Sequence, residues 1–275
     1  MHDERDEKVL RISFRRSGAP VWLGHLDIMH AFERGLRRAG VSLKYSQGYN
    51  PRPQLVFALP LGVGVEATDE VMDAYLAADV ELEGLTGRLT ESLPIGLMVQ
   101  ETRLLTLEEA KHLMADVAAA IYTITADGLS DALPNFYERD EIEVNKWSKG
   151  RKRKFNIKPL ILATEVLETS SHGVPSSVRF LVKAGSHSNL RPDLILEAAA
   201  ELGYLQPEDL ETCVIHREAL YLRPHRASLD EGGVQLLDPF MLEPLDALPC
   251  GLDAWDEAHH FLAPELLQTF SDSSQ

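Results

Sequence analysis

Three arginines on one predicted helix could bind the phosphate groups of an anionic partner. Residues 22–40 have the sequence WLGHLDIMHAFERGLRRAG, in which apolar residues recur at spacings of three and four. The same spacing gathers the basic residues on a different stripe, and these are Arg34, Arg37 and Arg38. A guanidinium group binds phosphate oxygens in two-point contacts, so this pattern favours phosphate binding over a merely solvated helix face.

The segment before this helix adds to the basic character. Residues 9–16 (VLRISFRR) are predicted to form a strand that ends in Arg15 and Arg16, followed by turn residues. Within the helix, His25 and Asp27 could form a catalytic pair. Alternatively, Asp27 could cap the helix by accepting backbone N–H bonds, and general helix-start preferences favour the cap.

Residues 45–53 (YSQGYNPRP) could contact nucleobases. Gly48 permits unusual backbone angles, and two prolines stiffen the exit from the turn. Tyr49 and Arg52 are of the types that stack on the bases of single-stranded RNA. A rigid turn with Tyr45 in the core is the competing interpretation, and the sequence favours neither. If the protein is an enzyme, Tyr45 joins His25 and Asp27 as a candidate catalytic residue.

A second basic segment covers residues 144–158, which contain seven Lys or Arg residues and no acidic one. Two aromatic residues are interleaved with the charges. The candidates for contact with nucleic acid are Lys146, Trp147, Lys149, Arg151, Lys152, Arg153 and Lys154. A solvated charge run is the usual alternative, but this density of charge near a tryptophan favours contact with a phosphate backbone.

The distribution of charge supports binding of an anion at these places. The 275-residue chain has a net charge of −16, yet residues 8–60 and residues 144–158 each carry +7, which leaves −30 on the rest. An acidic body repels nucleic acid everywhere except at a basic site. We also expect the two basic segments to converge on one surface, because each flanks the first strands of its own predicted unit.

Several protein classes are excluded by motif. The sequence has no G-x-x-x-x-G-K-[ST], no H-E-x-x-H and no G-x-S-x-G. Its cysteines, Cys213 and Cys250, are far apart, so neither a disulfide framework nor a cysteine-bound cluster or zinc is expected. No stretch approaches the ~20 apolar residues of a membrane helix. We therefore predict a cytoplasmic protein with no cofactor, no metal and no membrane partner.

The apolar periodicity predicts an α+β fold of two tandem ferredoxin-like (βαββαβ) units. The first domain covers 8–105, the second covers 117–222, and an acidic, partly helical C-terminal extension covers 223–275. The expected elements of the first domain are 9–16, 26–39, 41–45, 54–59, 71–76, 82–92 and 97–105. A helical connection at 106–116 leads to those of the second, at 119–126, 129–135, 152–168, 177–184, 192–202 and 212–222. A further amphipathic segment lies at 255–270.

The sequence resembles the radical SAM-linked protein family, a bacterial domain of unknown function (DUF2344-like). The matching stretches are 11–16, GHLD at 24–27, FERGLRRAG at 32–40, YSQGYNPRP at 45–53, ALPLGV at 58–63, KFNIKPLI at 154–161 and HREALYL at 216–222. The family usually has Ser at the position of Gly24 and His at that of Arg52. The resemblance implies a radical SAM protein as partner, because members are often fused to one or encoded beside one, and often near a ribonuclease and ribosomal protein genes.

These observations together predict an RNA-binding accessory protein that is not itself catalytic. It would act with a radical SAM enzyme or with ribonuclease or ribosome-related machinery. The chain has no C-x-x-x-C-x-x-C, so it does not itself hold a radical SAM cluster. Two alternatives stay open at this point. One is an RNA-processing or RNA-modifying enzyme, and the other is a protein-binding adaptor for a radical SAM partner.

Overall fold

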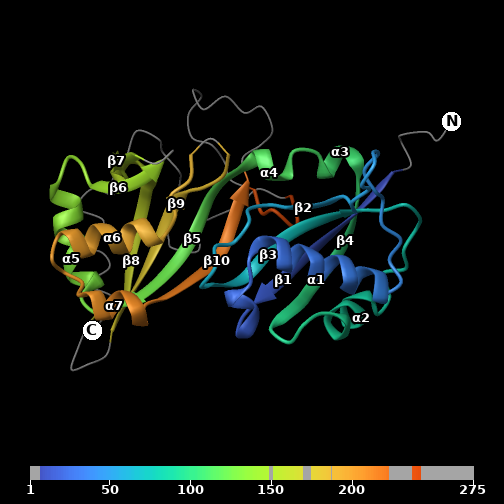
Figure 1. Ribbon diagram of the computed structural model, residues 1–275, viewed down its shortest axis with the longest axis horizontal. Helices are drawn as coiled ribbons and strands as arrows, with labels where there is room; N and C mark the ends of the chain where they lie inside the picture. Colours follow the sequence, from blue (N-terminus) through green and yellow to red (C-terminus); the bar gives the residue numbers. More distant parts are fainter. Residues whose placement is uncertain (1–6, 149–150, 170–174, 187, 223–236, 243–275) are drawn as a thin grey trace. The chain divides into compact units, whose positions relative to one another are not determined.

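The protein is a mixed α+β structure whose strands pair mostly antiparallel (Figure 1). The computed structural model describes residues 7–148, 151–169, 175–186, 188–222 and 237–242. The chain divides into two compact units. Among the described residues, unit 1 comprises 7–117, 217–222 and 237–242, and unit 2 comprises those between 118 and 216. In these ranges no helix is both long and apolar enough to cross a membrane.

Unit 1 contains both strands and helices. Its strands are β1 (Lys8–Arg16), β2 (Leu55–Phe57), β3 (Val65–Tyr75) and β4 (Leu97–Thr106). Its helices are η2 (Ala19–Trp22), α1 (His25–Arg38), α2 (Leu85–Ser92), α3 (Leu107–Ala110) and α4 (Leu113–Asp116). β1 lies between β4 and β3 and is antiparallel to both, and β2 pairs with β3. β3 also neighbours β10 (Val214–Leu222), whose residues from Arg217 onward belong to unit 1.

The main core of unit 1 lies between this sheet and the helices α1 and α2. Even-numbered residues of β1 such as Ile12 and Phe14 face the apolar stripe of α1. The ring of Phe14 meets that of Phe32 edge-on, with centroids 4.7 Å apart. Gly35 lets α1 approach the end of α2, because a Cβ there would come within 2.8 Å of the Leu93 side chain. Phe32 and Leu36 of the predicted apolar face are therefore confirmed as packing residues, whereas Leu26 is 60% exposed.

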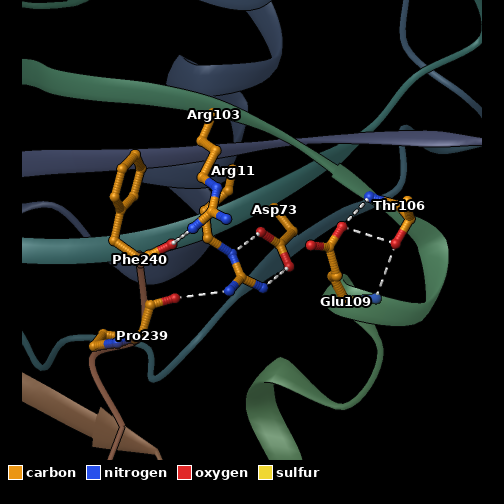
Figure 2. A network of polar contacts seen from close by, with 7 residues as sticks. All are labelled: Arg11, Asp73, Arg103, Thr106, Glu109, Pro239 and Phe240. Atoms are coloured by element: carbon orange, nitrogen blue, oxygen red, sulfur yellow. Dashed lines mark hydrogen bonds and ion pairs between the residues drawn. The ribbon is translucent and has the colours of Figure 1, made fainter. Parts of the chain in front are cut away.

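The opposite face of the same sheet carries buried charged residues beside an apolar cluster that includes Val9 and Leu105, and residues 237–242, which we call the C-terminal strap, lie against it (Figure 2). Arg11 pairs with Asp73 on the neighbouring strand through two 2.7 Å hydrogen bonds, and both side chains are 1% exposed. Arg11 Nη1 also donates to the carbonyl of Pro239 at 2.7 Å. Arg103 Nη1 donates to the carbonyl of Met241 at 2.7 Å. The strap thus supplies main-chain acceptors to two arginines of the sheet.

Unit 2 contributes antiparallel strands to the eight-stranded sheet and has a separate two-stranded hairpin. Its strands are β5 (Val117–Ala126), β6 (Glu143–Ser148), β7 (Arg151–Asn156), β8 (Ile161–Glu168) and β9 (Ser176–Lys183). Its helices are α5 (Leu129–Glu138), η3 (Lys158–Leu160), α6 (Asp193–Glu201) and α7 (Pro207–Thr212). β9 lies between β5 and β8, and β6 pairs with β7.

The structure corrects several predicted boundaries. The segment 152–168, expected as a strand with a turn, consists of the two strands β7 and β8, because Pro159 in η3 interrupts the extended chain. β6 was not predicted, since its polar sequence EVNKWS lacks the apolar alternation of a half-buried strand. β3 begins at Val65, earlier than the predicted 71. The predicted segment at 255–270 lies outside the described residues.

Candidate functional site

The exposed face of α1 carries the three predicted arginines in three different states. Arg37 forms an ion pair with Glu33 one turn earlier, at 2.6 Å. Arg38 donates to the carbonyl of Ser92. Arg34 is exposed, and within the described part of the chain its guanidinium has no hydrogen bond or ion pair. Arg34 is therefore the member of the stripe whose donors are available without breaking an existing contact.

The turn at 45–53 is closed by its own backbone and presents two side chains to solvent. Ser46 N donates to Arg52 O at 2.8 Å, and Arg52 N donates to Ser46 Oγ at 3.0 Å. Gly48 has a φ of +139°, a conformation that favours glycine. Tyr49 at the tip is 99% exposed. The guanidinium of Arg52 is exposed too, and no described residue accepts from it.

Tyr45 joins this turn to the helix. Its side chain is half-buried and packs against the core of unit 1, as the interpretation of a rigid turn predicted. The hydrogen bond to Glu33 is the main cause that raises the pKa of Arg37, and the nearby Tyr45 phenol adds to it. The first residue of the turn therefore lies near the last turns of α1 and packs against the same core. We call Arg34, Arg37, Arg38, Tyr49 and Arg52 the α1 surface.

Arg15 and Arg16 are separated by the alternation of β1. Arg15 is exposed, whereas Arg16 is 2% exposed. Arg16 therefore does not belong to the exposed basic surface on which the sequence analysis placed it. Its Nη2 donates to three main-chain carbonyls, those of Val21, Leu23 and Gly62. Its Nε is buried without a hydrogen-bond partner in the described part of the chain.

Arg16 lines a small pocket at the N-terminal end of α1. The pocket offers about 10 Å³ to the centre of a water-sized sphere, roughly the space of one water molecule. Its main apolar walls are Phe14, Ile28 and Phe57, and its polar walls are Arg16, His25 and Glu70. The imidazole of His25 meets the ring of Phe57 edge-on, at a centroid distance of 5.0 Å.

Glu70, one of the residues that line this pocket, belongs to a buried ion pair. Arg217 Nε donates to Glu70 Oε1 at 2.6 Å, and Arg217 Nη2 donates to Oε2 of the same carboxylate. The exposed fractions of the two side chains are 1% and 3%. Burial raises the pKa of Glu70, and the Arg217 guanidinium acts against that rise. Burial lowers the pKa of Arg16, and Glu70 acts against that change. The Glu70 carboxylate is therefore hydrogen-bonded to Arg217, whereas Arg16 feels its charge without a hydrogen bond to it.

The burial of His25 in this pocket predicts how the stability of the protein depends on pH. Burial lowers the pKa of His25 below its ordinary value of 6.5. As the pH falls through 6.5, His25 becomes protonated in the unfolded chain but stays neutral in the folded protein. The free energy of unfolding should therefore fall until the pH reaches the lower pKa of the folded state. An NMR titration of the imidazole should give a pKa below 6.5, and urea denaturation at pH 7 and pH 5 should show the loss.

Two substitutions test the assignment of this pH dependence to His25. His25→Gln should remove this part of the pH dependence. His30→Gln, which removes an exposed imidazole from the same helix, should leave it in place. An unchanged pH dependence in His25→Gln would show that other groups cause it.

The predicted capping role of Asp27 is wrong. α1 begins at His25 with Gly24 at its N-cap, and no side chain caps it. Because the helix begins two residues before Asp27, this carboxylate lies in the first turn and is exposed. There it still interacts favourably with the positive end of the helix dipole.

The second basic segment forms the β6–β7 hairpin of unit 2. The register places Trp147 opposite Lys152 and Lys146 opposite Arg153. Arg153 and Lys154 are exposed, and Lys154 Nζ forms an ion pair with Glu143 at 2.5 Å. Lys149 and the side chains of Lys146, Trp147, Arg151 and Lys152 lie outside the described part of the structure. Convergence of this segment with the α1 surface stays a prediction.

The residues that complete the pocket were not predicted from the sequence. Glu70 and Arg217 are 147 positions apart in the chain, and Phe57 has only the signature of a core residue. Trp22, which is 73% exposed beside the start of α1, also went unnoticed. Buried charges within apolar strands are the signal that could have indicated the ion pair. In the described ranges no cluster of His, Cys, Asp or Glu could hold a metal ion.

Comparisons with known proteins give a family but no activity. A family model described as "Uncharacterized protein conserved in bacteria (DUF2344)" matches residues 9–192. No curated protein matches the chain. One similar solved structure is that of an unknown protein from Galdieria sulphuraria, at 13% identity, with 77% of this chain and 97% of that chain covered. Its TM-score of 0.21 is too low to support an argument about fold or function.

Proposed function

We propose that this chain, which belongs to the DUF2344 family of uncharacterised proteins conserved in bacteria, binds single-stranded RNA on the α1 surface. One observation carries the proposal. Arg34 and Arg52 are exposed and have no ion-pair partner among the described residues, and Tyr49 lies fully exposed on the same turn as Arg52. Two available guanidinium groups and an exposed ring can bind phosphates and stack on a base at the same time.

The exposed ring favours a single strand over a duplex. Bases in an RNA helix are stacked on one another, so an aromatic side chain reaches their faces only where the strand is unpaired. The closed turn holds the Tyr49 backbone in place before RNA arrives, which lowers the entropy lost on binding. The β6–β7 hairpin would supply further phosphate contacts through Arg153 and the neighbouring basic residues.

An accessory role accounts for these residues better than catalysis does. Of the candidate catalytic residues, His25 packs against Phe57 in a pocket with room for one water, while Tyr45 packs partly into the core. General acid–base catalysis requires such groups within reach of one phosphate. We further propose that the partner is a radical SAM enzyme and that both units are ferredoxin-like. The partner rests on the family resemblance alone.

The test is the salt dependence of RNA binding by the full chain. Each phosphate contact on a single strand contributes about 0.7 to the slope of log affinity against log salt. The double variant Arg34→Gln/Arg52→Gln should therefore weaken binding for all RNA sequences and flatten the slope by roughly 0.7 per lost contact. Tyr49→Ala should cost about 1–3 kcal/mol of stacking with little change in slope. Fluorescence anisotropy with labelled oligonucleotides measures both.

A matched control removes the same charge elsewhere. Arg88→Gln/Arg139→Gln takes two exposed guanidinium groups from α2 and from the end of α5. This control should keep most of the affinity and most of the slope. Equal losses in the two double variants would refute a specific α1 surface. If the unaltered chain does not bind RNA even at low salt, the adaptor hypothesis replaces this one.

A further inference from the structure

Arg16 has hydrogen-bond donors that the protein does not use. All three of its acceptors bind the same nitrogen, Nη2. The described residues supply no acceptor for Nε, which is buried, or for Nη1. A buried donor without a partner costs about 1–3 kcal/mol, so native proteins rarely leave one unsatisfied unless a water or a ligand fills the place.

Two sources of positive charge favour an anion in the pocket lined by Arg16 and act against the Glu70 carboxylate, which also lines it. The nearby carboxylate of Glu70 is already bound by Arg217, so the charge of Arg16 has no carboxylate hydrogen-bonded to it. His25 and Ile28 place the first turn of α1 at the pocket wall. Gly24 leaves the N-terminus of this 14-residue helix without a side-chain cap. The positive end of the helix dipole therefore adds to the guanidinium charge.

We propose that this pocket binds one oxygen of a phosphoryl group, with the unused donors of Arg16 as its principal contacts. The space suits one oxygen atom, so the rest of the phosphoryl group would lie at the mouth beside the first turn of α1. The apolar walls, Phe14 and Phe57 among them, lower the local dielectric and so strengthen the attraction. The phosphoryl group is that of free phosphate or of the terminal monoester of an RNA strand.

His25 provides a direct readout of binding in the unaltered, full-length chain. An anion that enters the pocket lies next to this imidazole and favours its protonated form. Inorganic phosphate should therefore raise the His25 pKa by about 1 unit, as measured by NMR, relative to chloride at the same ionic strength. No phosphate-dependent change would overturn the proposal and leave the pocket as a hydration site for Arg16.

Two variants locate the binding at Arg16. Arg16→Lys keeps the charge but removes the guanidinium donors, and should weaken phosphate binding at least tenfold. Arg15→Lys, the same change at the exposed neighbour, should leave it unaltered. If Arg16→Lys fails to fold, Gly24→Asp provides an alternative test. The φ of Gly24 is −70°, which accepts a side chain, so an aspartate at this position caps the helix while its charge repels the anion. Phosphate binding that survives Gly24→Asp would contradict the proposal.

Phosphate binding in the pocket is separable from RNA binding on the α1 surface. In the Arg34→Gln/Arg52→Gln variant the His25 response to inorganic phosphate should persist, although RNA affinity falls. Oligonucleotides with and without a 5′ phosphate distinguish the two sources. If the strand end is the ligand, only the phosphorylated oligonucleotide raises the His25 pKa, and it does so at lower concentration than inorganic phosphate. If only inorganic phosphate raises the His25 pKa, the pocket binds the free anion.

Discussion

Replacing Arg217 with Met should destabilise the protein by about 3–5 kcal/mol, because it leaves the Glu70 carboxylate buried without its partner. The loss should be visible as a lower midpoint in urea denaturation followed by circular dichroism. The guanidinium also donates to the carbonyl of Leu59, so the substitution removes a second hydrogen bond from the wall of the pocket.

The matched control is Arg191→Met. Arg191 forms an ion pair with Asp193 in which both side chains are largely solvent-accessible, 60% and 41% exposed. Such pairs contribute about 0–1 kcal/mol, so the control should change stability little. The double variant Glu70→Met/Arg217→Met should recover most of the loss, since apolar side chains of similar volume often replace a buried pair without penalty. A single variant as mild as the control would show that Glu70 is solvated.

Asp73→Ala should cost a similar amount, about 3–5 kcal/mol, because Arg11 is then buried without its carboxylate. Figure 2 shows why the effect should reach the C-terminal strap: the guanidinium that binds Asp73 also donates to Pro239 O. Freed from Asp73, Arg11 can reorient and weaken this contact. Urea denaturation measures the stability. Hydrogen exchange at the amides of Leu222 and Leu237, which pair through their backbones, measures how firmly the strap is docked.

Asp79→Ala controls for the loss of an aspartate at the same end of unit 1. Asp79 pairs with Lys8 at 2.7 Å, but its side chain is 83% exposed. Its removal should alter stability by no more than about 1 kcal/mol. Faster exchange at Leu237 in Asp73→Ala, together with an unchanged rate in Asp79→Ala, is the expected pair of results. Unchanged exchange in both variants would show that the strap docks independently of the Arg11–Asp73 pair.

The sequence by itself determined the elements that local patterns control. The apolar spacing of α1 and the stop at Gly40 follow from helix periodicity and from the φ of +85° that favours glycine. The turn at 45–53 has its own stiff backbone, so the exposure of Tyr49 on it was predictable. Local patterns did not predict β6, whose polar residues do not alternate with apolar ones, or the start of α1, where Asp27 does not act as the cap.

Only the tertiary structure decided which arginines face solvent. Arg15 and Arg16 are neighbours of the same type, yet strand alternation exposes one and buries the other against the carbonyls of Val21, Leu23 and Gly62. The two-residue period of a strand predicts that neighbouring side chains lie on opposite faces of the sheet. It does not predict which of the two faces the helices cover.

Partnerships between distant residues were likewise beyond the sequence. Glu70 and Arg217, or Arg11 and the carbonyl of Pro239, come together through the pairing of strands and the docking of a strap. Each of these charges is stable in the interior only with its partner in place, and nothing local to either residue specifies that partner. The sequence therefore determined what charges the chain carries, and the fold decided which of them remain available to bind a ligand.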